Sequence, residues 1–158
     1  ILKKFPDSKL FFIGEGHTLI KMKELAKKLG VDDSTKFLGY VPHDEVLSMI
    51  SISKLIVHPT EFEGYSTVMK ETLALGKPIM VSNIKPLNEV VKDNENGYLI
   101  ENSVDDISSK IIRILYNNKN RLKVERKAKK FALNAYNLKK SIKTYENVFL
   151  NTIKNNSK

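Results

Sequence analysis

Two glutamates, Glu63 and Glu71, stand eight positions apart in the segment of this chain with the clearest chemical pattern. This segment, 61–78, follows the short apolar run 55–57 and passes through Gly64 into a stretch typical of a helix. A carboxylate accepts hydrogen bonds, donates none, and repels phosphate. Two carboxylates around one helix start therefore favour a ligand that offers hydroxyl groups, as sugars and riboses do.

The neighbouring residues predict how these glutamates are placed. His58-Pro59-Thr60 ends a buried strand, and a helix is expected over Thr67–Leu75, closed by Gly76 with Pro78 soon after it. In parallel α/β sheets such a strand-to-helix turn binds anions, because unpaired N–H groups and the helix dipole converge there. Ser66 or Thr67 can also cap the helix, a purely structural role that remains open.

Short apolar runs alternate with amphipathic stretches along the chain. We expect strands at 9–13, 35–38, 54–57, 79–82 and 98–100, and helices at 17–29, 44–52, 67–75, 86–92, 104–117, 121–134 and 141–153. This order predicts an α/β fold, with a parallel sheet covered by helices on both faces. The length of 158 residues is that of one domain with a substantial core.

The motif resembles the donor-site signature of the retaining, nucleotide-sugar-dependent glycosyltransferases of family 4, where it belongs to the C-terminal, Rossmann-like half of a two-domain GT-B fold. The family pattern is a Pro-Ser turn, Glu-Gly-Phe-Gly, a second Glu eight positions after the first, and a small-residue helix ending Gly-x-Pro. The matching residues here are Pro59-Thr60, Glu63-Gly64-Tyr65-Ser66, Glu71 and Gly76-Lys77-Pro78. Segments 5–16, 35–42, 78–83 and 88–100 also match in order and spacing, so the resemblance reaches about Tyr116 and, more loosely, Phe149.

The resemblance implies roles for particular residues. Glu63 would be the catalytic-site carboxylate that contacts sugar hydroxyls near the anomeric carbon, and Glu71 would accept both ribose hydroxyls. The β-phosphate would meet the backbone N–H groups of Gly64, Tyr65, Ser66 and Thr67, although the family usually has a second glycine where Ser66 stands. The remaining donor contacts are expected from Gly14, Gly16, Tyr40 and Val41. A solvated glutamate or a packing aromatic at Tyr40 stays open as the structural alternative.

No metal or cofactor is expected. The chain has no cysteine, and its three histidines, His17, His43 and His58, are scattered without ligand spacing. We interpret His58, at a strand end, as structural rather than catalytic. A nucleotide-sugar such as a UDP- or GDP-sugar would be the substrate.

The resemblance also implies missing parts. Ile1–Pro6 matches the end of the first helix of the donor domain, so the central first strand, an Arg and a Lys that hold the diphosphate, and the N-terminal acceptor domain would lie upstream. We expect a fragment in which residues 1–116 form the nucleotide-sugar-binding domain and residues 117–158 form basic helices packing on it. A glycosyltransferase of hexosyltransferase type is expected from the full-length protein, with the fragment alone inactive.

The net charge of +9 is concentrated at the C-terminal end. Residues 119–158 contain twelve Lys or Arg and two Glu, whereas the first 118 residues carry fifteen basic and sixteen acidic side chains. Such a region attracts anionic lipid or forms a solvated helix face. No apolar run approaches the roughly 20 residues of a membrane span. The resemblance implies an enzyme of polysaccharide or glycolipid assembly. The basic C-terminal region is compatible with a cytoplasmic location at the inner face of the membrane.

Two other functions remain open. A non-catalytic nucleotide- or nucleic-acid-binding module could use the basic helices, but the chain lacks any RNA- or DNA-binding motif and any interleaving of aromatic with basic residues, so no nucleic-acid partner is expected. A nonhydrolysing sugar-nucleotide epimerase shares the architecture, but its acid–base residues are not recognisable here. An epimerised nucleotide-sugar, rather than a glycosidic bond, would identify that enzyme.

Overall fold

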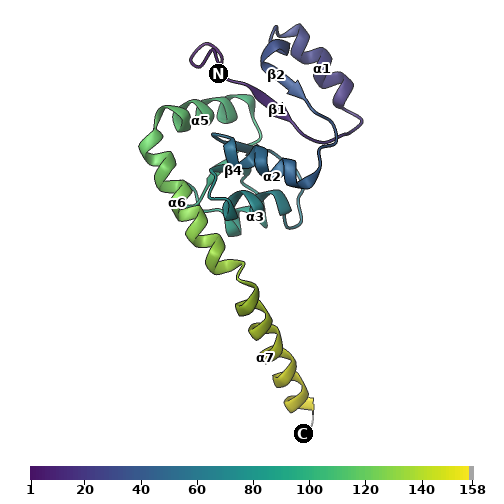
Figure 1. Ribbon diagram of the computed structural model, residues 1–158, viewed down its shortest axis with the longest axis vertical. Coiled ribbons are helices and arrows are strands. Elements are labelled where there is room, and N and C mark those ends of the chain that lie inside the picture. Colours follow the sequence, from purple (N-terminus) through teal and green to yellow (C-terminus); the bar gives the residue numbers. More distant parts are fainter. Residues whose placement is uncertain (157–158) are drawn as a thin grey trace.

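The computed structural model describes residues 1–156. The last two residues of the predicted basic region 117–158 lie outside the described residues. The chain alternates strands and helices, which confirms the predicted α/β class (Figure 1). The strands are β1 (Leu10–Phe12), β2 (Thr35–Phe37), β3 (Ile56–His58), β4 (Ile79–Ser82) and β5 (Tyr98–Ile100). The α-helices are α1 (Leu19–Lys28), α2 (His43–Ile52), α3 (Thr67–Ala74), α4 (Leu87–Val90), α5 (Val104–Tyr116), α6 (Asn118–Ala135) and α7 (Leu138–Asn156), with a 3-10 turn at Asp32–Ser34.

The strands form two parallel sheets, β1–β2 and β3–β4–β5. In the first sheet Leu10 lies opposite Thr35, and in the second Ile56 lies opposite Ile79. No strand of the described chain joins β1 to β3, and this break falls where the sequence analysis placed an absent central strand. β1 and β3 are each paired along one edge only, so the predicted sheet is observed as two separate sheets.

The core surrounds the second sheet. Side chains of a strand alternate between its two faces, and β4 is buried on both. Ile79 and Val81 pack with α3, α4 and the C-terminal half of α6, whereas Met80 packs with β5, α5 and Val124 of α6. Helices thus cover both faces, as predicted. By contrast, Ala26 is the one fully buried apolar side chain before Ile50 in the described chain.

The predicted helices differ from those observed mainly at their ends, and α7, expected over residues 141–153, extends three residues further at each end. A helix was expected over residues 86–92, but α4 ends at Val90 because Val91 is extended and the N–H of Lys92 donates to the Asn96 side chain. α6 begins three residues before the expected Arg121, because the side chain of Asn117 caps it by accepting from the N–H of Asn120.

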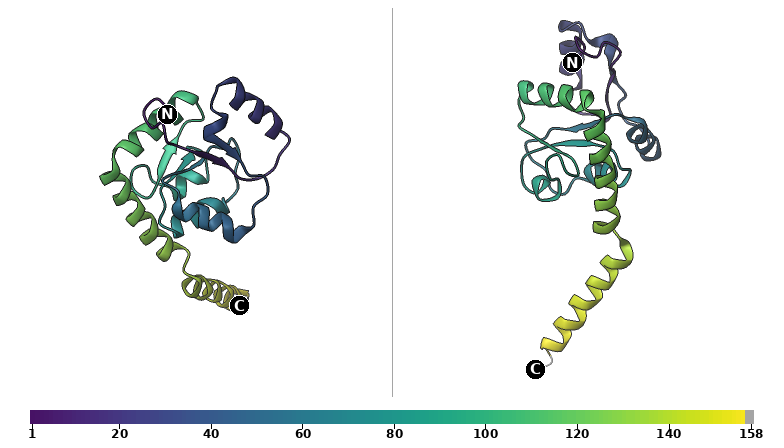
Figure 2. Two further views of the ribbon diagram at one scale, coloured as in Figure 1. Left: turned by 45° about the horizontal axis from the view of Figure 1, so that its top comes forward. Right: turned by 90° about the vertical axis from the view of Figure 1, so that its left-hand side faces the viewer.

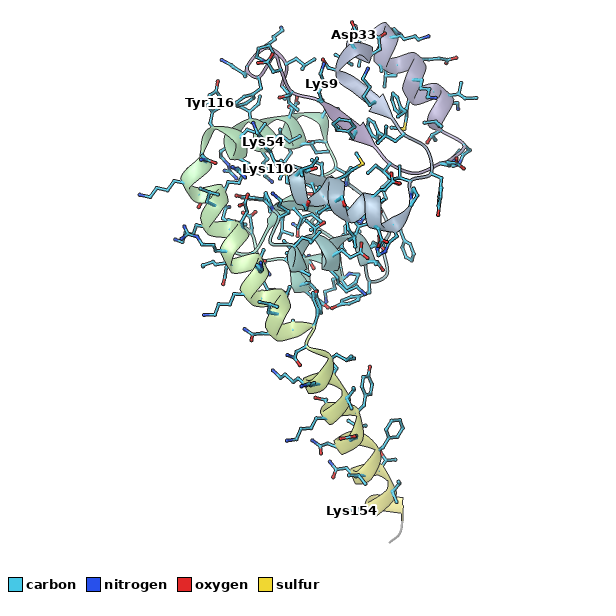
Figure 3. All side chains as sticks on the ribbon, viewed as in Figure 1. Lys9, Asp33, Lys54, Lys110, Tyr116 and Lys154 are labelled. Carbon is cyan, nitrogen blue, oxygen red and sulfur yellow. The ribbon has the colours of Figure 1, made fainter. Side chains whose placement is uncertain are left out.

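The two C-terminal helices sit differently on the domain. α6 packs along α3. The two elements approach so closely that a Cβ added at Gly76, just after α3, would lie 3.1 Å from Cβ of Lys129 in α6. α7 extends away from the body in every view (Figures 1 and 2), and its side chains project into solvent (Figure 3). Its exposed apolar residues include Leu138, Ile142, Tyr145, Val148, Phe149 and Leu150. Within the described residues, no helix is both long and apolar enough to cross a bilayer.

Candidate functional site

The start of α3 carries two free N–H groups. Ser66 is the N-cap, and its Oγ accepts from the N–H of Met69 at 3.2 Å. The N–H groups of Thr67 and Val68 have no hydrogen-bond acceptor in the described part of the chain. Because these groups lie at the positive end of the helix dipole, they can bind an anionic group.

Glu63 is held in the loop before α3. Its Oε1 accepts from the N–H of Gly64 at 3.1 Å, and its Oε2 lies 3.2 Å from Nε2 of His58, the last residue of β3. The Gly64 N–H, assigned to a phosphate in the sequence analysis, is therefore taken by Glu63 in this conformation. Only about a quarter of the Glu63 side chain is exposed, so its free lone pairs face a limited space.

Glu71 lies in the second turn of α3, next to the start of α2. Its Oε1 is 2.8 Å from Nε2 of His43, the first residue of α2. His43 follows Tyr40 by three positions, so this contact brings the Tyr40–Val41 segment to the side of α3 that carries Glu71. The Glu71 side chain is 22% exposed, while that of His43 is 65% exposed. A ligand can therefore reach the carboxylate beside the imidazole.

The ends of β1 and β2 bring two further predicted segments together. The N–H of Gly14 donates to the carbonyl of Gly39 at 2.7 Å, in an isolated bridge just beyond the two strands. Gly14 and Gly39 have φ values of 115° and 65°, which only glycine adopts readily. Gly16 and Tyr40 thus leave neighbouring strand ends. Tyr40 is 78% exposed, so it does not pack in the core.

A closed hydrogen-bond network joins the loops after β3, β4 and β5. The hydroxyl of Ser82 accepts from the N–H of Thr60 at 2.7 Å and donates to Oδ1 of Asn102 at 2.7 Å. Asn102 in turn donates from Nδ2 to the carbonyl of Thr60 at 2.8 Å. Because Ser82 is buried, this network fixes the root of the loop that carries Glu63.

Tyr65 lies on the other side of this loop. Its ring is half exposed and lies 4.6 Å from Nζ of Lys70, within cation–π range. Burial, and then the neighbouring Tyr65 hydroxyl, raise the pKa of Tyr136 at the end of α6. Tyr65 therefore places the loop beside the junction of α6 with α7.

The groups around Glu63, Glu71, Gly14 and Tyr40 lie beyond the carboxyl ends of parallel strands or in the first turns of the helices that follow them, where open α/β folds bind ligands. A model of the family described as glycosyl transferases group 1 matches residues 1–131. The chain belongs to this family. The solved structures of glycosyltransferases that it resembles share its parallel α/β arrangement, which confirms the predicted GT-B fold class.

Three proteins illustrate the relationship. An uncharacterized glycosyltransferase of Methanocaldococcus jannaschii is 30% identical over 142 residues, which are 89% of this chain and 36% of that protein. Anabaena HepE, in complex with UDP, has a TM-score of 0.83 at 18% identity over 92% of this chain and 42% of its own. The C-terminal domain of the group 1 family protein LpcC from Francisella tularensis has a TM-score of 0.77 at 26% identity, over 87% of this chain and 74% of that domain structure. The chain spans about a third of the length of the curated relatives it matches.

The sequence analysis named His43 and His58 but did not predict their contacts with Glu71 and Glu63. His58 could have been found from its place at the end of a predicted strand, five positions before Glu63. His43 is 28 positions from Glu71, and only the packing of α2 beside α3 brings them together. Ser82 also ends a predicted strand, but no local pattern indicates its contact with Asn102.

Proposed function

We propose that this chain is the donor-binding domain, the C-terminal half, of a retaining family 4 glycosyltransferase. The observation that carries the proposal is the arrangement at α3, where two free N–H groups lie between the carboxylates of Glu63 and Glu71. A diphosphate fits the helix start, and hydroxyl groups fit the carboxylates on either side. A nucleoside diphosphate sugar offers a diphosphate between two sets of hydroxyls.

Each part of the donor then has a partner. Glu71 accepts the two ribose hydroxyls, and Glu63 accepts hydroxyls of the sugar near its anomeric carbon. The segments around Gly14–Gly16 and Tyr40–Val41 lie beside the nucleoside. The presence of UDP in the structural neighbour HepE, and of UDP-glucose in another structure of that protein, supports a uridine nucleotide as the first donor to test.

The proposed reaction replaces one bond at the anomeric carbon by another on the same face. The bond from this carbon to the diphosphate oxygen breaks, the acceptor oxygen forms the new bond, and the acceptor proton passes to the leaving phosphate. The free N–H groups of Thr67 and Val68 stabilise the charge that develops on the diphosphate. Glu63 orients the sugar, so no protein nucleophile is required.

The acceptor would bind outside this chain. The relatives' greater length and the C-terminal position of the LpcC domain support a partner domain, preceding this one, that holds the acceptor and contributes basic side chains to the diphosphate site. On this basis the present chain binds donor, and transfer of the sugar to a polysaccharide or glycolipid acceptor requires both domains.

Replacement of Glu71 tests this function. In the full-length protein, Glu71→Ala should weaken binding of the nucleotide that the wild type selects from UDP, GDP and ADP, measured by calorimetry, because the ribose loses its acceptor. Glu89→Ala, at an exposed glutamate of α4, is the matched control. A wild type that binds no nucleotide, or a Glu71→Ala variant that binds as tightly as the control, would count against the proposal.

We also propose that the basic C-terminal helices bind an anionic membrane surface on the cytoplasmic side. Support comes from a hollow of about 390 Å³ at the junction of α6 and α7, lined by Leu133, Asn134, Asn137, Lys139, Lys140 and Lys143. Each lysine near an anionic surface contributes about 1 kcal/mol.

The matched test uses two sets of three lysine-to-glutamine changes, one at Lys139, Lys140 and Lys143 and one at the exposed Lys21, Lys23 and Lys27 of α1. The first set should reduce cosedimentation with phosphatidylglycerol vesicles more than the second. Equal effects of both sets would contradict the assignment to α7.

A further inference from the structure

We propose that His58 is a positioning residue for the donor site, a role that rests on the proposed function. Nε2 of His58 lies 3.2 Å from Oε2 of Glu63 and 3.2 Å from Oγ of Ser66. One imidazole nitrogen therefore contacts both polar side chains that flank the start of α3. Neither contact follows from the sequence motif, since the motif specifies the loop residues and not the strand that precedes them.

The imidazole belongs to the rigid part of the molecule. His58 is paired with Val81 in the register of β3 and β4, and its side chain is 25% exposed. Glu63 and Ser66 belong to the loop between β3 and α3. Contacts from a paired strand to a loop restrict the loop, because the strand backbone is fixed by its hydrogen-bond ladder.

The geometry points to a proton on Nε2. The Glu63 carboxylate is an acceptor, so an unprotonated Nε2 would bring two lone pairs together at 3.2 Å. With a hydrogen on Nε2, the imidazole donates to Glu63 and to Ser66. The Ser66 oxygen then accepts from His58 and from the N–H of Met69, which occupies both of its lone pairs.

The same contacts set the direction of Glu63. One carboxylate oxygen accepts from the N–H of Gly64 and the other from His58. Each oxygen retains a second lone pair, which can accept from a sugar hydroxyl. Without His58, the side chain would be held through one oxygen alone and could rotate away from the donor.

The ring spectrum tests this geometry without any ligand. In full-length protein with ¹⁵N-labelled histidine at alkaline pH, His58 should carry its proton on Nε2. In Glu63→Ala, the Ser66 hydroxyl can donate to Nε2, so the proton should move to Nδ1. A proton on Nδ1 in the wild type, or a ring spectrum unaffected by Glu63→Ala, would overturn the proposal.

The ligand measurement separates positioning from packing. Affinities are measured for UDP with UDP-glucose, GDP with GDP-mannose and ADP with ADP-glucose, and the pair that the wild type binds is used. In His58→Leu, the ratio of the affinity for the nucleotide-sugar to that for the nucleotide should fall by about tenfold, the usual effect of losing one hydrogen bond to a charged group. His58→Gln should retain most of it, because its amide N–H reaches the same position.

Packing alone would change both affinities of a pair by the same factor, and that result would overturn a positioning role. Failure of the wild type to bind any pair would instead contradict the proposed function, and His58 would still be judged by the ring spectrum.

Discussion

Removal of the N-cap of α3 should destabilise the chain more than removal of the N-cap of α5. Ser66 and Ser103 cap these helices in the same way, each with its Oγ 3.2 Å from the N–H three residues on. The substitutions Ser66→Ala and Ser103→Ala therefore each delete a hydroxyl and its hydrogen bond to a helix N–H, and Ser66→Ala also removes the contact with Nε2 of His58. The burial of the freed N–H group is the main difference, and the lost His58 contact acts in the same direction.

The freed group at α3 is that of Met69, which is fully buried, so water cannot replace the lost acceptor. The freed group at α5 is that of Asp106, at a helix start where Ser103 is exposed and water can reach. A lost cap costs about 0.5–2 kcal/mol, and a buried unsatisfied donor costs about 1–3 kcal/mol. We therefore expect about 2 kcal/mol for Ser66→Ala and about 0.5 kcal/mol for Ser103→Ala.

Thermal unfolding followed by circular dichroism measures both variants. For a chain of this size, about 1 kcal/mol lowers the Tm by about 2–4 °C. Ser66→Ala should thus lower the Tm by roughly 4–8 °C and Ser103→Ala by roughly 1–2 °C. Nucleotide binding should weaken in Ser66→Ala and remain unchanged in Ser103→Ala. Equal losses of Tm would refute the argument from burial, and unchanged nucleotide binding in Ser66→Ala would refute the role of this helix start.

Two further outcomes follow from the structure. Gly97→Ala should destabilise the chain by about 1–3 kcal/mol in urea unfolding, because the added Cβ would lie 2.7 Å from Cγ1 of Val91. Gly16→Ala, with no atom within 4 Å of the added Cβ, is the control, and an equal loss in both would contradict the packing argument. The hydrogen bond from Lys110 lowers the pKa of Asp106. The pair therefore stabilises the fold above the ordinary aspartate pKa of about 3.9, and less as the pH falls through the lowered pKa. Asp106→Asn should reduce stability at neutral pH and converge with the wild type in acid, and a difference that persists at low pH would exclude this linkage.

The sequence predicts what local residues determine. Each strand and helix was expected within a few residues of its observed position, because alternation and helical periodicity are properties of neighbouring residues. A cap at Ser66 or Thr67 was predicted in the same way, from small polar residues before a helical run, and Ser66 is the one that caps α3. The division of the sheet between β1 and β3 was expected only through the family resemblance, which placed an absent strand there, because strand pairing depends on residues distant in the chain.

In the candidate site, too, the sequence identifies residues that are close in the chain and not those brought together by folding. Glu63 and Glu71 belong to one contiguous motif and could be identified from it. The residues that support them are set largely by tertiary structure, since His43 reaches Glu71 from another helix and Ser82 holds Thr60, in the loop that carries Glu63, from another strand. A motif therefore identifies the residues that would meet a ligand but leaves out those that hold them.

The unequal burial of the two sheets has a consequence for local unfolding. The hydrophobic clusters draw on β3, β4, β5 and the helices packed on them, whereas the first forty residues contribute one fully buried apolar side chain, Ala26, to the described structure. Segments with so little buried apolar surface open at a free energy below that of global unfolding. Gly14 and Tyr40 lie on this weakly held half, and the two motif glutamates lie on the well-packed half. A ligand that contacts both halves would therefore bind only molecules in which the first half is folded. The free energy needed to fold that half would reduce the measured affinity.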